Sequence, residues 1–151
     1  MTYRLDYEEP IYRVVRRLKQ EHKEIDRKLR HVSNMSSDPQ MGNLKVAVSI
    51  IKATESEILR HAVEEEARLA RAIVESTATK DKSEQSVKIF HEHRRIKEFF
   101  EDELPYLLEE NSAKGAKRKV TEFVDLMIMH HRQEEKETFP LALEASQSKK
   151  K

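Results

Sequence analysis

The stretch Ile58-Leu-Arg-His-Ala-Val-Glu-Glu-Glu-Ala-Arg-Leu69 decides the fold, because apolar and polar residues recur in it at helical spacing. Residues at three- and four-residue steps stack on one face of a helix, and here those residues are Ile58, His61, Glu65 and Leu69. A histidine and a glutamate thus stand where the stripe calls for core residues. The pattern predicts a long helix, from about Leu44 to Val74, with polar residues in its buried stripe.

Three further segments carry a stripe of the same kind, and each stripe includes a histidine. The first stripe comprises Ile11, Val14, Leu18, His22, Ile25, Leu29 and Val32. The third comprises Ile89, His93, Ile96, Phe100 and Leu104. The fourth comprises Ala116, Val120, Phe123, Met127, His130, Glu134, Thr138 and Leu141. The sequence therefore predicts four helices, the third opening near Ser83 and kinked or ended by Pro105.

The composition agrees with an all-α fold, since the chain has only 2 Gly and 4 Pro and is rich in helix-forming residues. Short breaks at 36–43, 77–82 and 111–115 favour antiparallel neighbours in an up-down-up-down four-helix bundle. A length of 151 residues fits one domain, residues 1–151. We expect its core at about 10–144 and a charged tail at 146–151.

Several function classes are excluded by composition. The chain has no Cys, so disulfides, Cys-based zinc sites, iron-sulfur clusters and thiol catalysis are absent. A formal net charge of +1 gives no basic field for nucleic acid. Residues 1–10 are too polar for a signal peptide, and the longest apolar stretch, around Val46 to Ile51, cannot span a bilayer. We therefore expect a cytoplasmic protein.

The two halves of the chain repeat one layout. Glu21-His22-x-x-Ile25 returns in the second half as Glu92-His93-x-x-Ile96. His-x-x-x-Glu-Glu occurs at 61–66 and again at 130–135. Each half predicts a helical hairpin, and two such hairpins can pack about a pseudo-twofold axis. Measured from the breaks, the histidines lie at similar heights, so we expect their polar positions to meet in one layer inside the bundle.

Imidazole and carboxylate ligands delivered together are the set that borderline transition metals prefer. Without a cation, the layer would bury carboxylates and imidazoles at a cost of several kcal/mol per unpaired charge. The alternative is a metal-free polar network. The predicted metal ligands are His22, His61, Glu65, His93, His130 and Glu134.

This ordered set, with Phe139-Pro140 after the last motif, resembles the hemerythrin-like, or HHE cation-binding, family over about 12–143. The resemblance implies two iron ions per chain in a non-haem centre, bridged by Glu65, Glu134 and an oxo or hydroxo group. It implies that His22 and His61 serve one iron and that His93 and His130 serve the other. An octahedral position would then be open to a small diatomic ligand, oxygen or nitric oxide.

Two departures from the oxygen-carrying members of this family bear on function. Those members carry a further histidine four residues from the other on the third helix, where this chain has Ile89 and Lys97. They also use an Asp one residue farther along in the last motif, whereas this chain has Glu134, as in a broader group with nitric-oxide-responsive and iron-centre repair proteins. The repair proteins carry a Cys-bearing segment, which this chain lacks.

The leading interpretation is a protein that binds or responds to a diatomic ligand. One alternative is a di-iron redox enzyme acting on peroxide, nitric oxide or damaged iron centres, and another is a metal-free interaction bundle. Ferritin-like oxidases use Glu-x-x-His, and no histidine of this chain has a Glu three residues before it.

The other polar residues near the motifs are expected mainly at the surface. Solvated or salt-bridged roles are expected for Glu21, Glu66, Glu92 and Glu135. Asp26 and Glu57, one turn from a predicted ligand, could instead accept an imidazole N–H. Surface or boundary positions are expected for His31, His91 and His131, which fall off the stripes.

Overall fold

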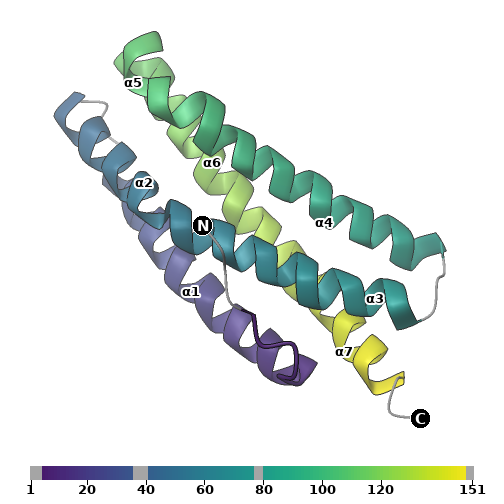
Figure 1. The fold of residues 1–151 in the computed structure, drawn as a ribbon. Helices are drawn as coiled ribbons and strands as arrows, with labels where there is room; N and C mark the ends of the chain where they lie inside the picture. Colours follow the sequence, from purple (N-terminus) through teal and green to yellow (C-terminus); the bar gives the residue numbers. More distant parts are fainter. Residues whose placement is uncertain (1–4, 36–40, 77–79, 149–151) are drawn as a thin grey trace.

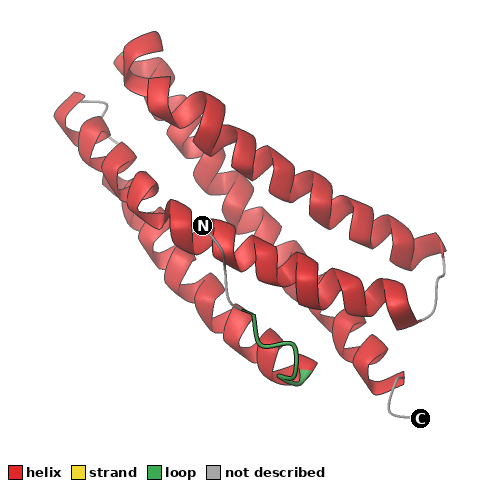
Figure 2. Cartoon of the chain, viewed as in Figure 1, coloured by secondary structure: helices red, strands yellow, loops and turns green. Residues whose placement is uncertain are grey.

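A computed structural model describes residues 5–35, 41–76 and 80–148, nearly all of them helical (Figures 1 and 2). Four helical segments lie alongside one another (Figure 1). The first two comprise α1 (Ile11–Met35), then α2 (Met41–Glu64), the π-helix η1 (Glu65–Ala70) and α3 (Arg71–Ser76). The third comprises α4 (Lys80–Glu98), the π-helix η2 (Phe99–Glu103), the 3-10 turn η3 (Leu104–Tyr106) and α5 (Leu107–Glu110). The fourth comprises α6 (Ala113–Gln133), the π-helix η4 (Glu134–Thr138) and α7 (Phe139–Ser148).

The predicted all-α class is confirmed, since the described residues include no strand. The four segments pack as a helical bundle, in which α1 contacts both α2 and α6, and α3 contacts both α4 and α7. Pro105 lies in η3, as its missing N–H and fixed φ lead one to expect. The third segment is thus interrupted at Pro105, and it resumes as α5.

Several helix boundaries differ from the predicted ones. The fourth segment already begins at Ala113, because Ser112 caps it by accepting a hydrogen bond from Gly115 N–H at 3.1 Å. Gly115 therefore belongs to the first turn rather than to the break. Likewise, α2 begins at Met41 and α4 at Lys80, while residues 36–40 and 77–79 of the expected breaks lie outside the described residues. At the other end, α7 continues to Ser148, so the first part of the expected tail is helical.

The apolar core is divided into two clusters along the bundle. The large cluster includes Ile25, Ile51, Ile58, Phe100, Val120 and Met127. The small cluster comprises Val14, Val15, Leu18, Leu69, Ile73, Phe139 and Ala142. Along α1, the small cluster ends at Leu18 and the large one begins at Ile25, with buried His22 between them. The same gap, from Ile58 to Leu69 and from Met127 to Phe139, holds the two His-x-x-x-Glu motifs.

The N-terminal residues are tied to the small-cluster end of the bundle. The guanidinium of Arg68, which is buried, donates hydrogen bonds to the backbone carbonyls of Asp6 and Glu9. Its carbon lies 5.9 Å from the centre of the Tyr7 ring, a cation-π arrangement. These contacts hold the segment before α1 against η1.

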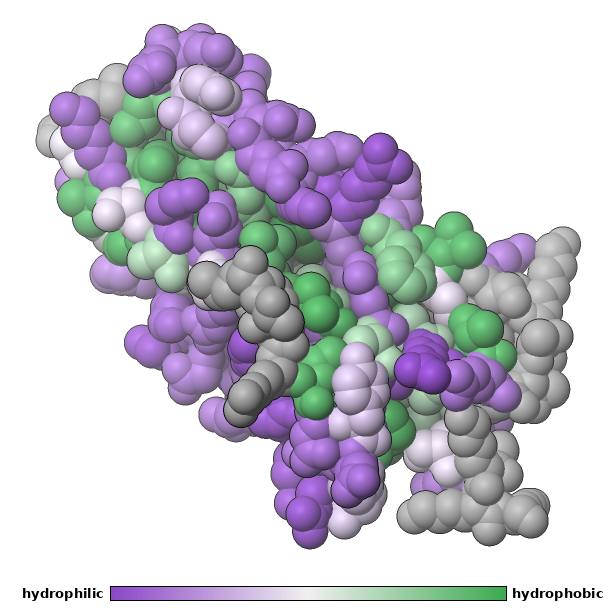
Figure 3. Space-filling view, viewed as in Figure 1, coloured by the Kyte–Doolittle hydropathy of each residue, from purple (hydrophilic) through white to green (hydrophobic). Residues whose placement is uncertain are grey.

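Hydrophilic side chains dominate the face drawn in Figure 3, and hydrophobic ones show as patches between the helical segments. This is the expected surface of helices that bury one stripe and expose the rest. Within the described ranges, no helix is both long enough and apolar enough to cross a membrane.

Candidate metal centre

The structure brings all six predicted ligands together in the gap between the apolar clusters, and each of them is buried. Two groups of side chains have potential ligand atoms that all lie within 4.8 Å of one another. The His22 group comprises His22, His61, His131 and Glu134. The His93 group comprises Glu65, His93, His130 and Glu134. These buried groups could hold a metal ion, and together they form what we call the polar layer.

The two carboxylates lie between imidazoles of both groups. Glu65 Oε1 is 2.7 Å from His61 Nε2 and 3.9 Å from His93 Nε2. In the other motif, Glu134 Oε1 is 3.0 Å from His130 Nε2 and 3.4 Å from His22 Nε2. Each carboxylate therefore reaches the histidine one turn before it and a second histidine on a neighbouring helical segment.

Polar atoms in this layer lack hydrogen-bond partners. Among the described residues, the buried side-chain N and O atoms without a hydrogen bond are His22 Nδ1 and Nε2, His61 Nε2, both carboxylate oxygens of Glu65, His93 Nε2 and both carboxylate oxygens of Glu134. Leaving a buried polar atom unpaired typically costs about 1–3 kcal/mol, and more when it is charged. Because every one of these atoms belongs to the polar layer, the cost is concentrated where a cation could remove it.

Carboxylates outside the layer fix the outer nitrogens of its histidines. His61 Nδ1 donates to Glu21 Oε1 at 2.9 Å, and His130 Nδ1 donates to Glu92 Oε2 in the same way. An ionised carboxylate can only accept, so each imidazole carries a proton on Nδ1 and turns Nε2 inward. This arrangement is typical of metal-binding histidines.

The second glutamate of each doublet also faces a histidine, from the other half of the chain. Glu66 accepts from His93 Nδ1 at 3.0 Å, and Glu135 Oε1 lies 3.6 Å from His22 Nδ1. The expected salt-bridged roles are therefore found for Glu21, Glu66 and Glu92, but their partners include the buried imidazoles of the predicted ligands. These side chains are partly exposed, yet they bond imidazoles, because a position beside a core stripe faces the neighbouring helix and not only solvent.

Electrostatics differ between the histidines of the His22 group. Burial, reinforced by the positive charges of His131 and His61, lowers the pKa of His22 far below its usual range. Burial also lowers the pKa of His61, but Glu65 and Glu21 outweigh it and raise that pKa to about 9. For Glu21, burial is outweighed by hydrogen bonds from His61 and Arg60, which bring its pKa to about 2. Glu21 thus remains a carboxylate behind His61.

His131 is the member of the layer that sequence reasoning missed. It was expected at the surface, yet it is 1% exposed. Its ring stacks on that of His22, with centroids 3.9 Å apart and planes inclined by 15°. His131 follows His130 on α6, so its side chain points about 100° away from that of His130 around the helix. It therefore lies outside the apolar stripe that includes His130. The sequence feature that pointed to a further buried imidazole was Asp26, one turn after His22. In the structure, Asp26 accepts a hydrogen bond from His131 Nδ1 at 2.6 Å.

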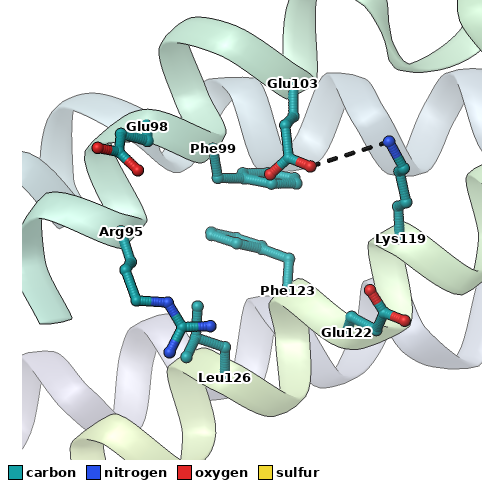
Figure 4. A pocket seen from close by; sticks show the side chains of 8 residues that line it. All are labelled: Arg95, Glu98, Phe99, Glu103, Lys119, Glu122, Phe123 and Leu126. Atoms are coloured by element: carbon teal, nitrogen blue, oxygen red, sulfur yellow. Dashed lines mark ion pairs between the residues drawn. The ribbon is translucent and has the colours of Figure 1, made fainter.

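The remaining residues singled out in the sequence stand apart from the layer. His31 and His91 are exposed, as expected. Glu57 pairs with Lys28 at 3.0 Å instead of accepting an imidazole N–H. The cleft drawn in Figure 4, between α4–η2 and α6, is lined by the ion pair of Lys119 with Glu103, by further charged side chains and by the stacked rings of Phe99 and Phe123. It includes none of the layer's residues.

Two π-helices begin at the layer's carboxylates, η1 at Glu65 and η4 at Glu134. Such turns are rare and occur often at functional sites. Pro140 follows η4 and Pro105 follows η2, and a proline cannot donate to the preceding turn and clashes with its carbonyl. This accounts for the widening of the α-helix into a π-helix before each of the two prolines.

Comparison with known proteins adds no identification. No family model, no curated protein and no solved structure matches the chain.

Proposed function

We propose that the chain is a cytoplasmic, hemerythrin-like non-haem di-iron protein that binds or responds to a diatomic ligand, oxygen or nitric oxide. In this proposal, the four helical segments alternate in direction, and the two hairpins are related by a pseudo-twofold axis. His22 and His61 bind one iron, His93 and His130 bind the other, and Glu65 and Glu134 bridge them.

The observation that carries the proposal is the set of unpartnered buried atoms in the polar layer. They are imidazole nitrogens and carboxylate oxygens, the donor set that suits iron and neighbouring transition metals. Hydrogen bonds from His61 to Glu21 and from His93 to Glu66 hold the opposite ring nitrogens. Orientation of a ligand by a carboxylate behind it is a regular feature of metal sites.

The position of the carboxylates supports two ions rather than one. Glu134 belongs to both groups, and Glu65 approaches an imidazole of each. A carboxylate has two oxygens and can place one toward each of two ions. One such carboxylate comes from each half of the chain, Glu65 and Glu134, and this supports a site for two ions.

A groove of about 390 Å³ lies beside His93. Its lining combines the apolar Leu59, Ala62, Val63 and Phe90 with the charged Glu66, Arg94 and Lys97. The apolar side chains allow a small, uncharged molecule to approach His93. A di-iron centre supplies reversible coordination of diatomic molecules, and the residues of this chain would orient the ligands and exclude water.

The proposal is tested by producing the protein with ample iron, purifying it without oxygen and measuring iron per chain. We expect about two. The diferrous protein is then mixed with oxygen, nitric oxide and peroxide in a stopped-flow spectrometer, and we expect a stable adduct with oxygen or nitric oxide. Rapid oxidation with turnover of peroxide would contradict the binding function in favour of a redox enzyme.

A matched pair of variants on α4 controls for indirect effects. His93→Ala removes a proposed ligand, whereas His91→Ala removes an exposed histidine on the same helix. We expect His93→Ala to lower the iron content and His91→Ala to leave it unchanged. An iron content near zero in the unaltered protein would overturn the di-iron assignment.

A further inference from the structure

The polar layer departs from the internal repeat at one pair of positions. When His130 is aligned with His61, His131 on α6 corresponds to Ala62. When His93 is aligned with His22, Asp26 on α1 corresponds to Lys97. The His131–Asp26 pair therefore has no equivalent in the other half. Every predicted ligand, by contrast, has a repeat partner.

The geometry of His131 matches that of the predicted ligands. It is buried, and its ligand atom lies within 4.8 Å of those of His22, His61 and Glu134. Asp26 accepts from Nδ1 at 2.6 Å, which leaves Nε2 as the nitrogen available to an ion. Asp26 thus stands behind His131 as Glu21 stands behind His61.

We propose that His131 is a metal ligand positioned by Asp26, and that it makes the two ion positions unequal. The inference rests on the proposed function, because it assumes an ion in each group. With Glu65 and Glu134 shared, the ion of the His22 group has three imidazoles and the ion of the His93 group has two. Nothing in the predicted ligand set gives this difference.

The inequality sets an order of loading and release. Imidazole is a good ligand for late first-row ions such as Co²⁺ and Zn²⁺, and an additional imidazole slows their departure. The His22 group therefore fills first and empties last. A half-loaded protein holds its ion among His22, His61 and His131.

The test follows release of Co²⁺ from the loaded, full-length protein after addition of excess chelator, through the visible absorption of the bound ion. The unaltered protein should release two ions in two phases of equal amplitude, at rates that differ by about 10-fold or more. His131→Gln keeps a polar side chain and should accelerate the slow phase until the two merge. Asp26→Asn should accelerate the same phase by about 10- to 100-fold.

Matched controls carry the same chemical changes at exposed positions. His31→Gln on α1 and Asp125→Asn on α6 should leave both phases unchanged. Acceleration of both phases alike by His131→Gln would mean a general structural role and would overturn the inference. So would release from that variant at the unaltered rates.

The conservative Asp26→Asn variant decides the matter if His131→Gln does not fold, since unchanged release from it would also overturn the inference. Failure of the unaltered chain to hold two ions would contradict the proposed function instead, and the inference with it. The number of ions that the unaltered chain holds therefore tests the proposed function, whereas the release rates of the variants test the role of His131.

Discussion

The two halves of the described chain, residues 11–35 with 41–76 and residues 80–148, carry the same pattern of histidines and glutamates but differ in the charges behind them. In the first, Glu21 accepts from Arg60 at 2.7 Å and lies 3.7 Å from Arg17. In the second, the repeat partners of those arginines are Met129 and Lys88. Among the described residues, no arginine pairs with Glu92.

The two halves thus agree at the predicted ligand positions and differ in the charges behind them. The shared spacing brings imidazoles and carboxylates of both halves into one layer. The charges behind them act on the imidazoles through a hydrogen bond that forms in both halves. Two equivalent motifs thus place their imidazoles in unequal electrostatic settings.

Removing the shared carboxylate should produce the largest loss of bound metal, because both groups lose a ligand at once. Glu134 belongs to both, so Glu134→Ala should cost both ions. Glu137→Ala, on the same π-helix with a side chain 41% exposed, is the control and should retain them. Metal analysis after gel filtration measures the outcome, and retention of one full ion by Glu134→Ala would argue against a shared position.

Removing the carboxylates behind the imidazoles should affect one ion each. Glu21→Gln and Glu92→Gln should each weaken binding of the nearer ion by about 10- to 100-fold, as loss of such an orienting group typically does. Glu21→Gln should have the larger effect, since it also leaves Arg60 without this partner. Competition against a calibrated chelator gives the affinities, with the exposed Glu24→Gln as control. Equal effects of the two variants would show that the arginines are irrelevant.

The pH dependence of the metal-free protein should report the His22 group. Burial lowers the pKa values of His22 and His131 below the unfolded value of about 6.5. The unfolded chain therefore binds more protons, and stability falls as pH drops below 6.5. For His61, Glu65 and Glu21 outweigh burial and raise the pKa to about 9, so its contribution is complete below 6.5 and is lost as pH rises toward 9.

These opposed contributions predict a maximum of stability near pH 6.5, measured by urea unfolding from pH 5.5 to 8.5. His22→Gln should flatten the acid side and leave the alkaline side in place. A stability that rises steadily across this range would contradict the assignment for His61.

Changing one residue of the first half to its counterpart in the second should give the smallest effect. Arg60→Met introduces the residue found at the corresponding position 129 and removes a pair with Glu21 whose arginine side chain is 38% exposed. The free energy of unfolding should fall by about 0.5–1 kcal/mol, the scale of a partly exposed ion pair. Arg94→Met, which breaks an ion pair whose arginine is 80% exposed, should change it by less. Urea unfolding compares the two, and an equal loss would show that Arg60 acts only as a surface charge.

The sequence was sufficient to place the six predicted ligands in one layer, because each occupied a helical stripe otherwise made of apolar residues. His22, for example, lies between Leu18 and Ile25, and no other face of α1 could bury all three. The all-α class followed from the same periodicity. Stripe and composition are local properties, so a single sequence reveals them.

Helical stripes could not predict that the side chains of His131, Glu66 and Glu92 take part in the polar layer or bond its imidazoles. Their side chains lie beside a stripe, and whether such a position faces solvent or a partner depends on how closely the next helix approaches. The π-helices at Glu65 and Glu134 add a rotation that helical spacing does not anticipate. The start of α6 was displaced because Ser112 caps this helix earlier than the Gly115 signal suggested.

The division of the core by the polar layer has a consequence for how the molecule opens. Apolar contacts hold each cluster together internally, whereas the layer between them contributes unpaired polar atoms. The metal-free chain should therefore behave as two cooperative units, and amide hydrogens around Val15, Ile73 and Ala142 in the small cluster should exchange before those around Ile51 and Val120. Ions bound in the layer would join the units, and the difference in amide protection should disappear.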